Sequence, residues 1–155
     1  MSWSEKMNPA VREWLLEPNT PGARYLALRD VLTLAPTDPE LIEARAQAHQ
    51  NGPIAEILEH MQPGGFWMKP GPGYSGKYKS TVWSVIALAQ LGASIDHDPR
   101  IAQACDHLLE HALVPRGAFG TSGNPSSNID CLQGNLCAAL IDLGCTDPRL
   151  ETAFE

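Results

Sequence analysis

Residues 81–113 read TVWSVIALAQLGASIDHDPRIAQACDHLLEHAL, and they contain two helix-like stretches of different character. The first, residues 81–91, is apolar almost all round, which is typical of a helix surrounded by other helices. The second, residues 99–113, places apolar and polar side chains on opposite sides, so we expect one buried stripe. The buried side should hold Ile101, Ala104, Leu108 and Ala112, and the solvent side Arg100, Gln103, Asp106 and Glu110.

Pro and Gly mark where the expected helices begin and end. At five positions a capping residue directly precedes a Pro that opens an apolar-periodic stretch, and its side-chain oxygen can accept from a free amide of the first turn. Gly92 and Gly144 follow runs of helix formers and should adopt the left-handed conformation that ends a helix. No segment alternates apolar and polar residues as a strand would, so we predict an all-α fold. The five starts are Asn8-Pro9, Thr20-Pro21, Asp38-Pro39, Asp98-Pro99 and Asp147-Pro148.

An internal repeat organises these helices. The similar strings ALRDVL, ALAQLG and ALIDLG begin at Ala27, Ala87 and Ala139, and each precedes a loop and an Asp-Pro helix start. A period near 50 residues built from helix pairs indicates either an open solenoid or a closed ring. We predict a single domain over residues 1–155 with three helix pairs, at about residues 8–60, 61–113 and 114–155. The mostly apolar stretches, residues 81–91 and 129–143, should form an inner layer, with amphipathic helices outside.

Two segments carry a resemblance to a known superfamily. They are QPGGFWMKPGPGYSGKYKSTVWSVIALAQLG (residues 62–92) and GAFGTSGNPSSNIDCLQGNLCAALIDLG (residues 117–144). Both resemble the α/α-toroid repeats of terpenoid cyclases and protein prenyltransferases, and residues 62–67 look like a shortened Gln-Trp motif of squalene and hopene cyclases. The resemblance covers about residues 54–150 and implies a ring of helix pairs around an apolar cavity that binds an isoprenoid.

The catalytic motifs of this superfamily are absent or incomplete in the sequence. The DxDD acid motif of the protonating cyclases is absent from the sequence, so we name no catalytic residue. Asp130-Cys131 partly resembles the zinc-binding Asp and Cys of prenyltransferases, although that family separates the two by one residue. We predict no metal and no other cofactor. Because complete toroids contain more than three helix pairs, the resemblance implies a fragment truncated at its C-terminus.

A positively charged loop precedes the first inner helix. No acidic residue lies between Glu59 and Asp96, whereas residues 69–80, KPGPGYSGKYKS, contain three lysines and two tyrosines. The free amides at the helix start favour an anion there, so the loop could hold a diphosphate or another anionic head group. The alternative is a solvated loop whose lysines balance nearby acids.

The corresponding start of the next inner helix is unusually polar. Its polar side chains either bond to neighbouring loops or face a ligand. The predicted ligand site combines residues at the starts of the two inner helices with the lysines and aromatic residues of the loop. It consists of Lys69, Tyr74, Lys77, Tyr78, Trp83, Asp130, Gln133 and Asn135.

Cysteine and histidine patterns favour packing over metal chemistry. The four cysteines contain no CxxC pair, so we expect reduced, packed thiols. His107 to His111 fit the string H-x-x-E-H of inverted zinc peptidases, but no third ligand is evident, and we expect solvent-side histidines on the outer helix. The cysteines are Cys105, Cys131, Cys137 and Cys145.

Composition excludes several classes of protein. With 11 basic and 18 acidic residues, the chain has a net charge of -7 and lacks a basic block for nucleic-acid binding. The longest near-apolar stretch, residues 85–93, is too short to span a membrane, and residues 1–14 lack the apolar region of a secretion signal, so we expect a cytoplasmic protein.

Two functions stay open at this point. The first is binding of an isoprenoid or another apolar ligand with an anionic head group, with possible cyclase or prenyltransferase-like turnover. The second is a non-catalytic helical scaffold for protein interaction, with possible self-association through an apolar face of the terminal repeat.

Overall fold

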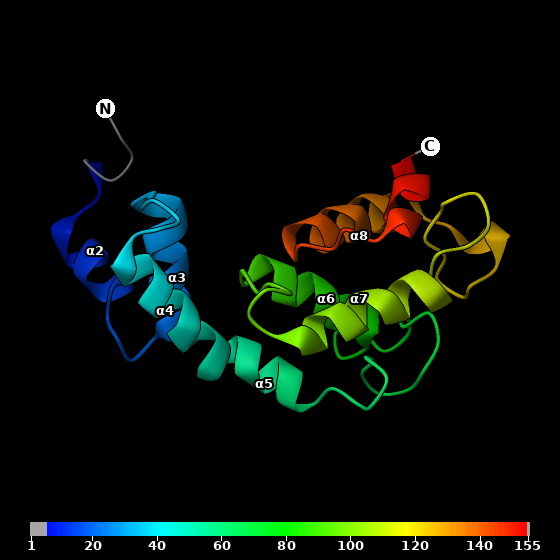
Figure 1. Cartoon of the computed structure of the whole chain (residues 1–155), viewed down its shortest axis with the longest axis horizontal. Helices are drawn as coiled ribbons and strands as arrows, with labels where there is room; N and C mark the ends of the chain where they lie inside the picture. Colours follow the sequence, from blue (N-terminus) through cyan, green and yellow to red (C-terminus); the bar gives the residue numbers. More distant parts are fainter. Residues whose placement is uncertain (1–5, 155) are drawn as a thin grey trace. The chain divides into compact units, whose positions relative to one another are not determined.

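The computed structural model describes residues 6–154, and over this range the chain is helical with isolated β-bridges but no strand (Figure 1). The all-α prediction is therefore confirmed for these residues. The chain divides into two compact units, Met1–Glu56 and Ile57–Glu155, which we call unit 1 and unit 2. The boundary lies close to the end of the first expected helix pair.

Residues 7–56 of unit 1 form three helices and the start of a fourth. They are α2 (Pro9–Leu15), α3 (Pro21–Leu26), α4 (Pro39–Gln50) and α5 (Pro53–Glu59), and α3 continues into a π-helical turn (Ala27–Val31). Helix α3 packs against α4, and an ion pair of 2.8 Å between Arg24 and Glu40 joins the two at their surface. Their buried side chains are Tyr25, Leu28, Leu41, Ala44 and Ala48.

Unit 2 is built around α6 (Thr81–Gln90), which packs against both α7 (Pro99–His111) and α8 (Asp130–Asp142) (Figure 1). Two 3₁₀ segments, Pro125–Ser127 and Pro148–Phe154, flank α8. The largest fully buried side chains of this unit come from the end of α5, from these three helices and from the segments that follow α7 and α8. They are Leu58, Val82, Val85, Leu88, Ile101, Leu108, Phe119, Leu136, Leu140 and Leu143.

The predicted helix starts are confirmed at four of the five positions by a side-chain cap. The carboxylates or amide oxygen of Asn8, Asp38, Asp98 and Asp147 each accept a bond of 2.9 Å from the amide two residues later. Helix α3 also begins at its proline, but the Thr20 hydroxyl donates back to the Glu17 carbonyl instead of capping it. The segment after Asp147 is a 3₁₀ helix rather than an α-helix.

The two predicted helix stops are also confirmed. Gly92 has a φ of 77° and Gly144 a φ of 88°, which lie in the left-handed region. After each glycine the next amide reaches back to the helix, from Ala93 to the Leu88 carbonyl at 3.0 Å and from Cys145 to the Leu140 carbonyl at 2.9 Å. This pairing is the Schellman arrangement that satisfies the last carbonyls of a helix.

The burial expected for each helix is confirmed for α7, holds for most residues of α6 and holds only in part for α8. The four predicted stripe residues of α7 are fully buried, and its four predicted solvent-side residues are exposed. Helix α8 buries Leu136 and Leu140 but leaves Ala138 and Ile141 exposed. The prediction of a helix surrounded on all sides was wrong for residues 129–143 because α6 covers one face of α8 and leaves another open to solvent.

Close backbone approaches hold the long loop of residues 61–80 against α7. A Cβ atom added at Gly65 would lie 2.2 Å from the backbone oxygen of Gln103, whereas one added at Gly71 would meet nothing within 4 Å. Both glycines have positive φ angles, so a side chain would be strained at either position. The two positions differ in the room that is available for a Cβ atom.

We therefore expect Gly65→Ala to lower the free energy of unfolding by about 3 kcal/mol, because the new methyl group forces the loop away from α7. Gly71→Ala is the matched control and should cost only about 1 kcal/mol, the strain of a left-handed alanine. Urea unfolding followed by circular dichroism measures both. Equal losses in the two variants would contradict the close approach.

Candidate functional site

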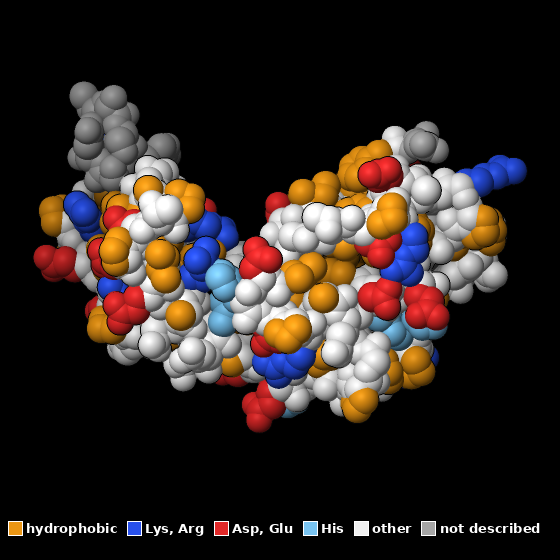
Figure 2. All heavy atoms as spheres, viewed as in Figure 1, with side chains coloured by type: hydrophobic (Ala, Val, Ile, Leu, Met, Phe, Trp, Pro, Cys, Tyr) orange, Lys and Arg blue, Asp and Glu red, His pale blue; other side chains and the backbone are white. Residues whose placement is uncertain are grey.

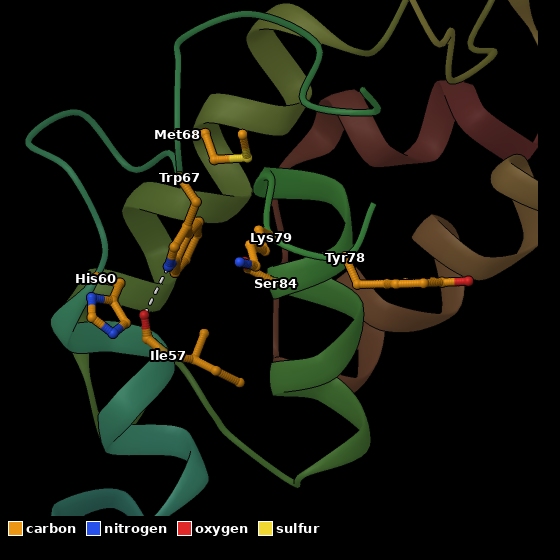
Figure 3. Close-up of a pocket in the computed structure, with 7 residues that line it drawn as sticks. All are labelled: Ile57, His60, Trp67, Met68, Tyr78, Lys79 and Ser84. Atoms are coloured by element: carbon orange, nitrogen blue, oxygen red, sulfur yellow. Dashed lines mark hydrogen bonds between the residues drawn. The ribbon is translucent and has the colours of Figure 1, made fainter. Parts of the chain in front are cut away.

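A pocket of about 410 Å³ lies beside α6 in unit 2 (Figure 3). Its walls come from the end of α5, from the loop of residues 61–80 and from the first turn of α6. We call it the Trp67 pocket. Its lining residues are Ile57, His60, Trp67, Met68, Tyr78, Lys79 and Ser84.

Trp67 forms the most firmly held wall of this pocket. Its side chain is only 3% exposed, and its indole Nε1 donates a hydrogen bond of 2.7 Å to the Ile57 carbonyl (Figure 3). Its backbone amide donates to the buried Thr81 hydroxyl at 3.2 Å. These two bonds tie the loop to α5 on one side and to the first residue of α6 on the other.

The glycine-rich part of the loop is pinned to the same helix start. The Ser80 hydroxyl donates to the Gly73 carbonyl at 2.7 Å, and the Val82 amide donates to the same carbonyl at 3.2 Å. A Cβ atom at Gly73 would lie 2.6 Å from the Thr81 Cβ, so only glycine permits this approach. Both ends of the segment of residues 74–79 are therefore fixed at the start of α6.

Lys79 is the charged group of the pocket. Figure 3 shows its amino group reaching toward Trp67, while the Tyr78 ring points away from it. Met68 is 61% exposed and stands at the rim. The pocket thus combines apolar walls with one ammonium group.

A second constellation, which we call the aromatic cluster, consists of Tyr74, Tyr78 and Trp83. The Trp83 ring lies 5.6 Å from that of Tyr74 and 5.2 Å from that of Tyr78. The Trp83 Nε1 donates to the Tyr74 carbonyl at 3.0 Å, which fixes the indole against the loop. The ammonium of Lys77 lies 5.5 Å from the centre of the Trp83 ring and 6.0 Å from that of Tyr74.

The structure brings together four of the eight residues in the predicted ligand site, namely Tyr74, Lys77, Tyr78 and Trp83. Lys69 is exposed and is not a lining residue of the Trp67 pocket. Asp130 and Asn135 lie on exposed positions of α8. A ligand-binding role for these eight residues stays a prediction.

The side chain of Gln133 bonds to neighbouring segments, which is one of the two roles expected for the polar start of this helix. Its Oε1 accepts from the Phe119 amide at 2.6 Å, and its Nε2 donates to the carbonyls of Gly117 and Ala153 at 3.0 and 2.7 Å. The side chain thereby joins α8 to the loop before it and to the 3₁₀ segment after it. Its hydrogen-bonding capacity is used within the protein.

Several pocket residues had no signal in the sequence. Ile57 and His60 belong to the end of α5 and to the residue after it, where nothing in their spacing indicates a pocket. Ser84 is small and nearly buried on an otherwise apolar helix. The three meet only because the loop of residues 61–80 folds back on α6.

His107 is not on the solvent side, which corrects the prediction made for it. It is 5% exposed, and its ring nitrogens lie 3.1 Å from the Gly64 carbonyl and 3.1 Å from the Gly71 carbonyl. The loop of residues 64–71 covers this part of α7. It therefore encloses His107, which helix periodicity alone places on the solvent side. A neutral imidazole has one N–H and can donate to only one of these carbonyls at a time.

Burial is the main cause that lowers the pKa of His107, and the charge of nearby His111 lowers it further. The two backbone carbonyls and Glu110 act in the opposite direction but do not outweigh burial. The His111 ring lies 4.3 Å from that of His107. The folded protein therefore favours the neutral form of His107.

The cysteines follow the packing prediction in part. Cys105 and Cys137 are buried, and burial together with the neighbouring Cys145 thiol raises the pKa of Cys105 to about 12. Such a thiol is a packing group rather than a nucleophile. Cys131 is exposed, so the packing prediction was wrong there, because it lies on the uncovered face of α8.

Residues 6–154 offer neither a cluster of metal-binding side chains nor a helix suited to cross a membrane. Within that range, no group of three or more His, Cys, Asp or Glu side chains is placed to hold a metal ion. None of the helices in the same range combines the length and apolar character needed to cross a membrane.

Comparison of the chain with known protein families, with curated protein sequences and with solved structures gives no significant match.

The lowered pKa of His107 leads to a pH-dependent stability. As the pH falls below the ordinary histidine value of 6.5, the unfolded chain takes up a proton that the folded protein resists, so the free energy of unfolding should fall between pH 7 and pH 5. His107→Gln keeps a donor for one carbonyl but does not titrate, so this variant should lose less stability over that range. Urea unfolding at several pH values measures it, and identical pH slopes for both proteins would contradict the assignment.

Proposed function

We propose that unit 2 binds an apolar ligand with an anionic head group, and that the Trp67 pocket receives it. The observation that supports this proposal is the combination of apolar walls with the single ammonium of Lys79 in a pocket of about 410 Å³. Small-molecule sites have volumes of this order and pair apolar walls with a few placed polar groups. An isoprenoid diphosphate has both of the required chemical parts.

The charge pattern supports an anionic head group. Residues 60–95 contain no Asp or Glu, so nothing within that stretch competes with a ligand anion for Lys79. No ion pair within residues 6–154 includes Lys79. A phosphate at the rim of the pocket would therefore gain an ion pair without breaking one.

We further propose that unit 2 is part of an α/α-toroid arrangement. In such an arrangement successive inner helices neighbour one another and each outer helix packs on an inner one. The packing of α6 against α8 and against α7 supports this order of layers. The exposed face of α8 is where a further helix pair would pack.

A prenyl diphosphate at about 100 times its dissociation constant should raise the melting temperature by roughly 5 to 10 °C. Lys79→Ala should lose most of this rise because it removes the ammonium of the pocket, and Met68→Glu should lose it through charge repulsion at the rim. Lys69→Ala removes the same charge from the same loop outside the pocket and should keep the wild-type rise. Differential scanning fluorimetry measures all four proteins.

Two ligand controls complete that experiment. The corresponding prenyl alcohol tests the tail alone, and inorganic diphosphate tests the head group alone; each should give a smaller rise than the complete ligand. No rise with the prenyl diphosphate, or equal losses in Lys79→Ala and Lys69→Ala, would contradict the proposed site.

A second candidate function is a non-catalytic helical scaffold that self-associates. It is favoured by exposed apolar side chains at the C-terminal end of unit 2, where Ile141 is 52% and Phe154 63% exposed. Figure 2 shows hydrophobic side chains, in orange, over this part of unit 2. Large apolar side chains exposed to solvent are typical of surfaces that bind proteins.

If this face joins two copies, the wild-type protein should show a concentration-dependent mass in sedimentation equilibrium between 5 and 200 μM, concentrations chosen to span about micromolar affinity. Ile141→Glu should abolish the association because it places a charge in the buried centre of the contact. Gln103→Glu adds the same charge to the exposed side of α7 and should leave the association unchanged. A monomeric mass at every concentration would contradict self-association.

A further inference from the structure

The aromatic cluster already holds a cation from its own loop. The Lys77 ammonium lies 5.5 Å from the centre of the Trp83 ring and 6.0 Å from that of Tyr74, within the range of cation–π attraction. No ion pair within residues 6–154 includes Lys77. Its exposed ammonium therefore faces aromatic rings and water rather than a carboxylate.

The Tyr74 and Tyr78 rings both contact the Trp83 ring, and neither lies parallel to it. The Tyr74 ring is inclined by 44° to that of Trp83, and the Tyr78 ring by 72°. Trp83 is held by the first turn of α6 and by its bond of 3.0 Å to the Tyr74 carbonyl. Tyr78 is 76% exposed, so the cluster is open to molecules from solution.

Lys77 is a weak occupant of such a site. Its ammonium is compact, strongly hydrated and carries three N–H groups, which the ring faces satisfy less well than water does. A quaternary ammonium has no N–H group and spreads its charge over methyl groups that can contact the rings directly. Aromatic clusters of this kind are a common means of recognising quaternary ammonium ligands.

We infer that Tyr74, Tyr78 and Trp83 form a binding site for a quaternary ammonium group, and that Lys77 is an internal competitor for it. This site takes a cation, whereas the Trp67 pocket is proposed to take an anionic ligand. The two share Tyr78, and a titration with a simple cation tests the cation site without the anionic ligand. The ligand class is a trimethylammonium group, as found in choline esters and in trimethylated lysine side chains. Displacement of Lys77 is the event that admits the ligand.

The test is a titration with tetramethylammonium chloride at constant ionic strength, followed by the NMR signal of the Trp83 indole N–H. Trp83→Phe identifies this signal. Lys77→Ala should bind about twofold more tightly than the wild type, the gain expected if Lys77 occupies the site about half of the time. Tyr78→Ala, which changes an exposed ring, should weaken binding in either background.

Two controls separate this site from general effects of charge and of apolar contact. Lys69→Ala removes a lysine of the same loop for which no ring contact is recorded, and it should bind like the wild type. Tert-butanol has a similar shape without the charge and should give no saturable shift. Absence of saturation in Lys77→Ala, an equal response to tert-butanol, or equal gains in Lys77→Ala and Lys69→Ala would each overturn the inference.

The source of the group is distinguished by two further ligands. Tighter binding of phosphocholine than of trimethyl-lysine would support a choline-type head group, because neighbouring lysines then add an ion pair to the phosphate. Tighter binding of trimethyl-lysine would support a modified side chain. Either order supports the trimethylammonium site itself.

Discussion

Burial of α6 between α7 and α8 is the interaction on which unit 2 depends. Val82, Val85 and Leu88 have no exposed surface, and burying each such side chain contributes roughly 1.5 to 3 kcal/mol. The same burial leaves the first turn of α6 as the fixed point to which the loop of residues 61–80 attaches. Thr81 and Val82 provide polar groups of that turn, and Trp67 and Gly73 bond to them. The position of the Trp67 pocket therefore follows from the packing of α6.

The loop itself is held by polar bonds to buried or backbone groups rather than by an apolar core of its own. His107 faces two loop carbonyls, Trp67 donates to the end of α5, and Ser80 donates to Gly73. Bonds of this kind are favourable only while water is excluded, since a buried group that loses its partner costs about 1 to 3 kcal/mol. The conformation of the loop therefore depends on the neutral imidazole of His107. It also depends on Gly65 and Gly73, where a Cβ atom would clash with neighbouring atoms.

The two lysines near α6 meet different surroundings although they are two residues apart. Lys79 reaches into a pocket with apolar walls, where an anion would be its partner. Lys77 lies against the Trp83 and Tyr74 rings, where it takes the place that another cation could occupy. A sequence with three lysines and two tyrosines in one loop indicates attraction of anions. The orientation of the rings adds a cation site that the charge pattern alone does not reveal.

Local signals in the sequence determined the helices of this protein. Asp98 before Pro99, Gly92 after α6 and the stripe of α7 each act within one or two turns, so neighbouring residues are enough to read them. The grouping of Tyr74, Lys77, Tyr78 and Trp83 was predictable for the same reason, because all four lie within ten residues of one another. Only the tertiary structure decided which faces are covered. His107 meets carbonyls 43 and 36 residues away, Gln133 bonds to a loop and to a later segment, and α8 keeps one side open. Such contacts depend on how the chain returns on itself, and helix periodicity carries no information about that return.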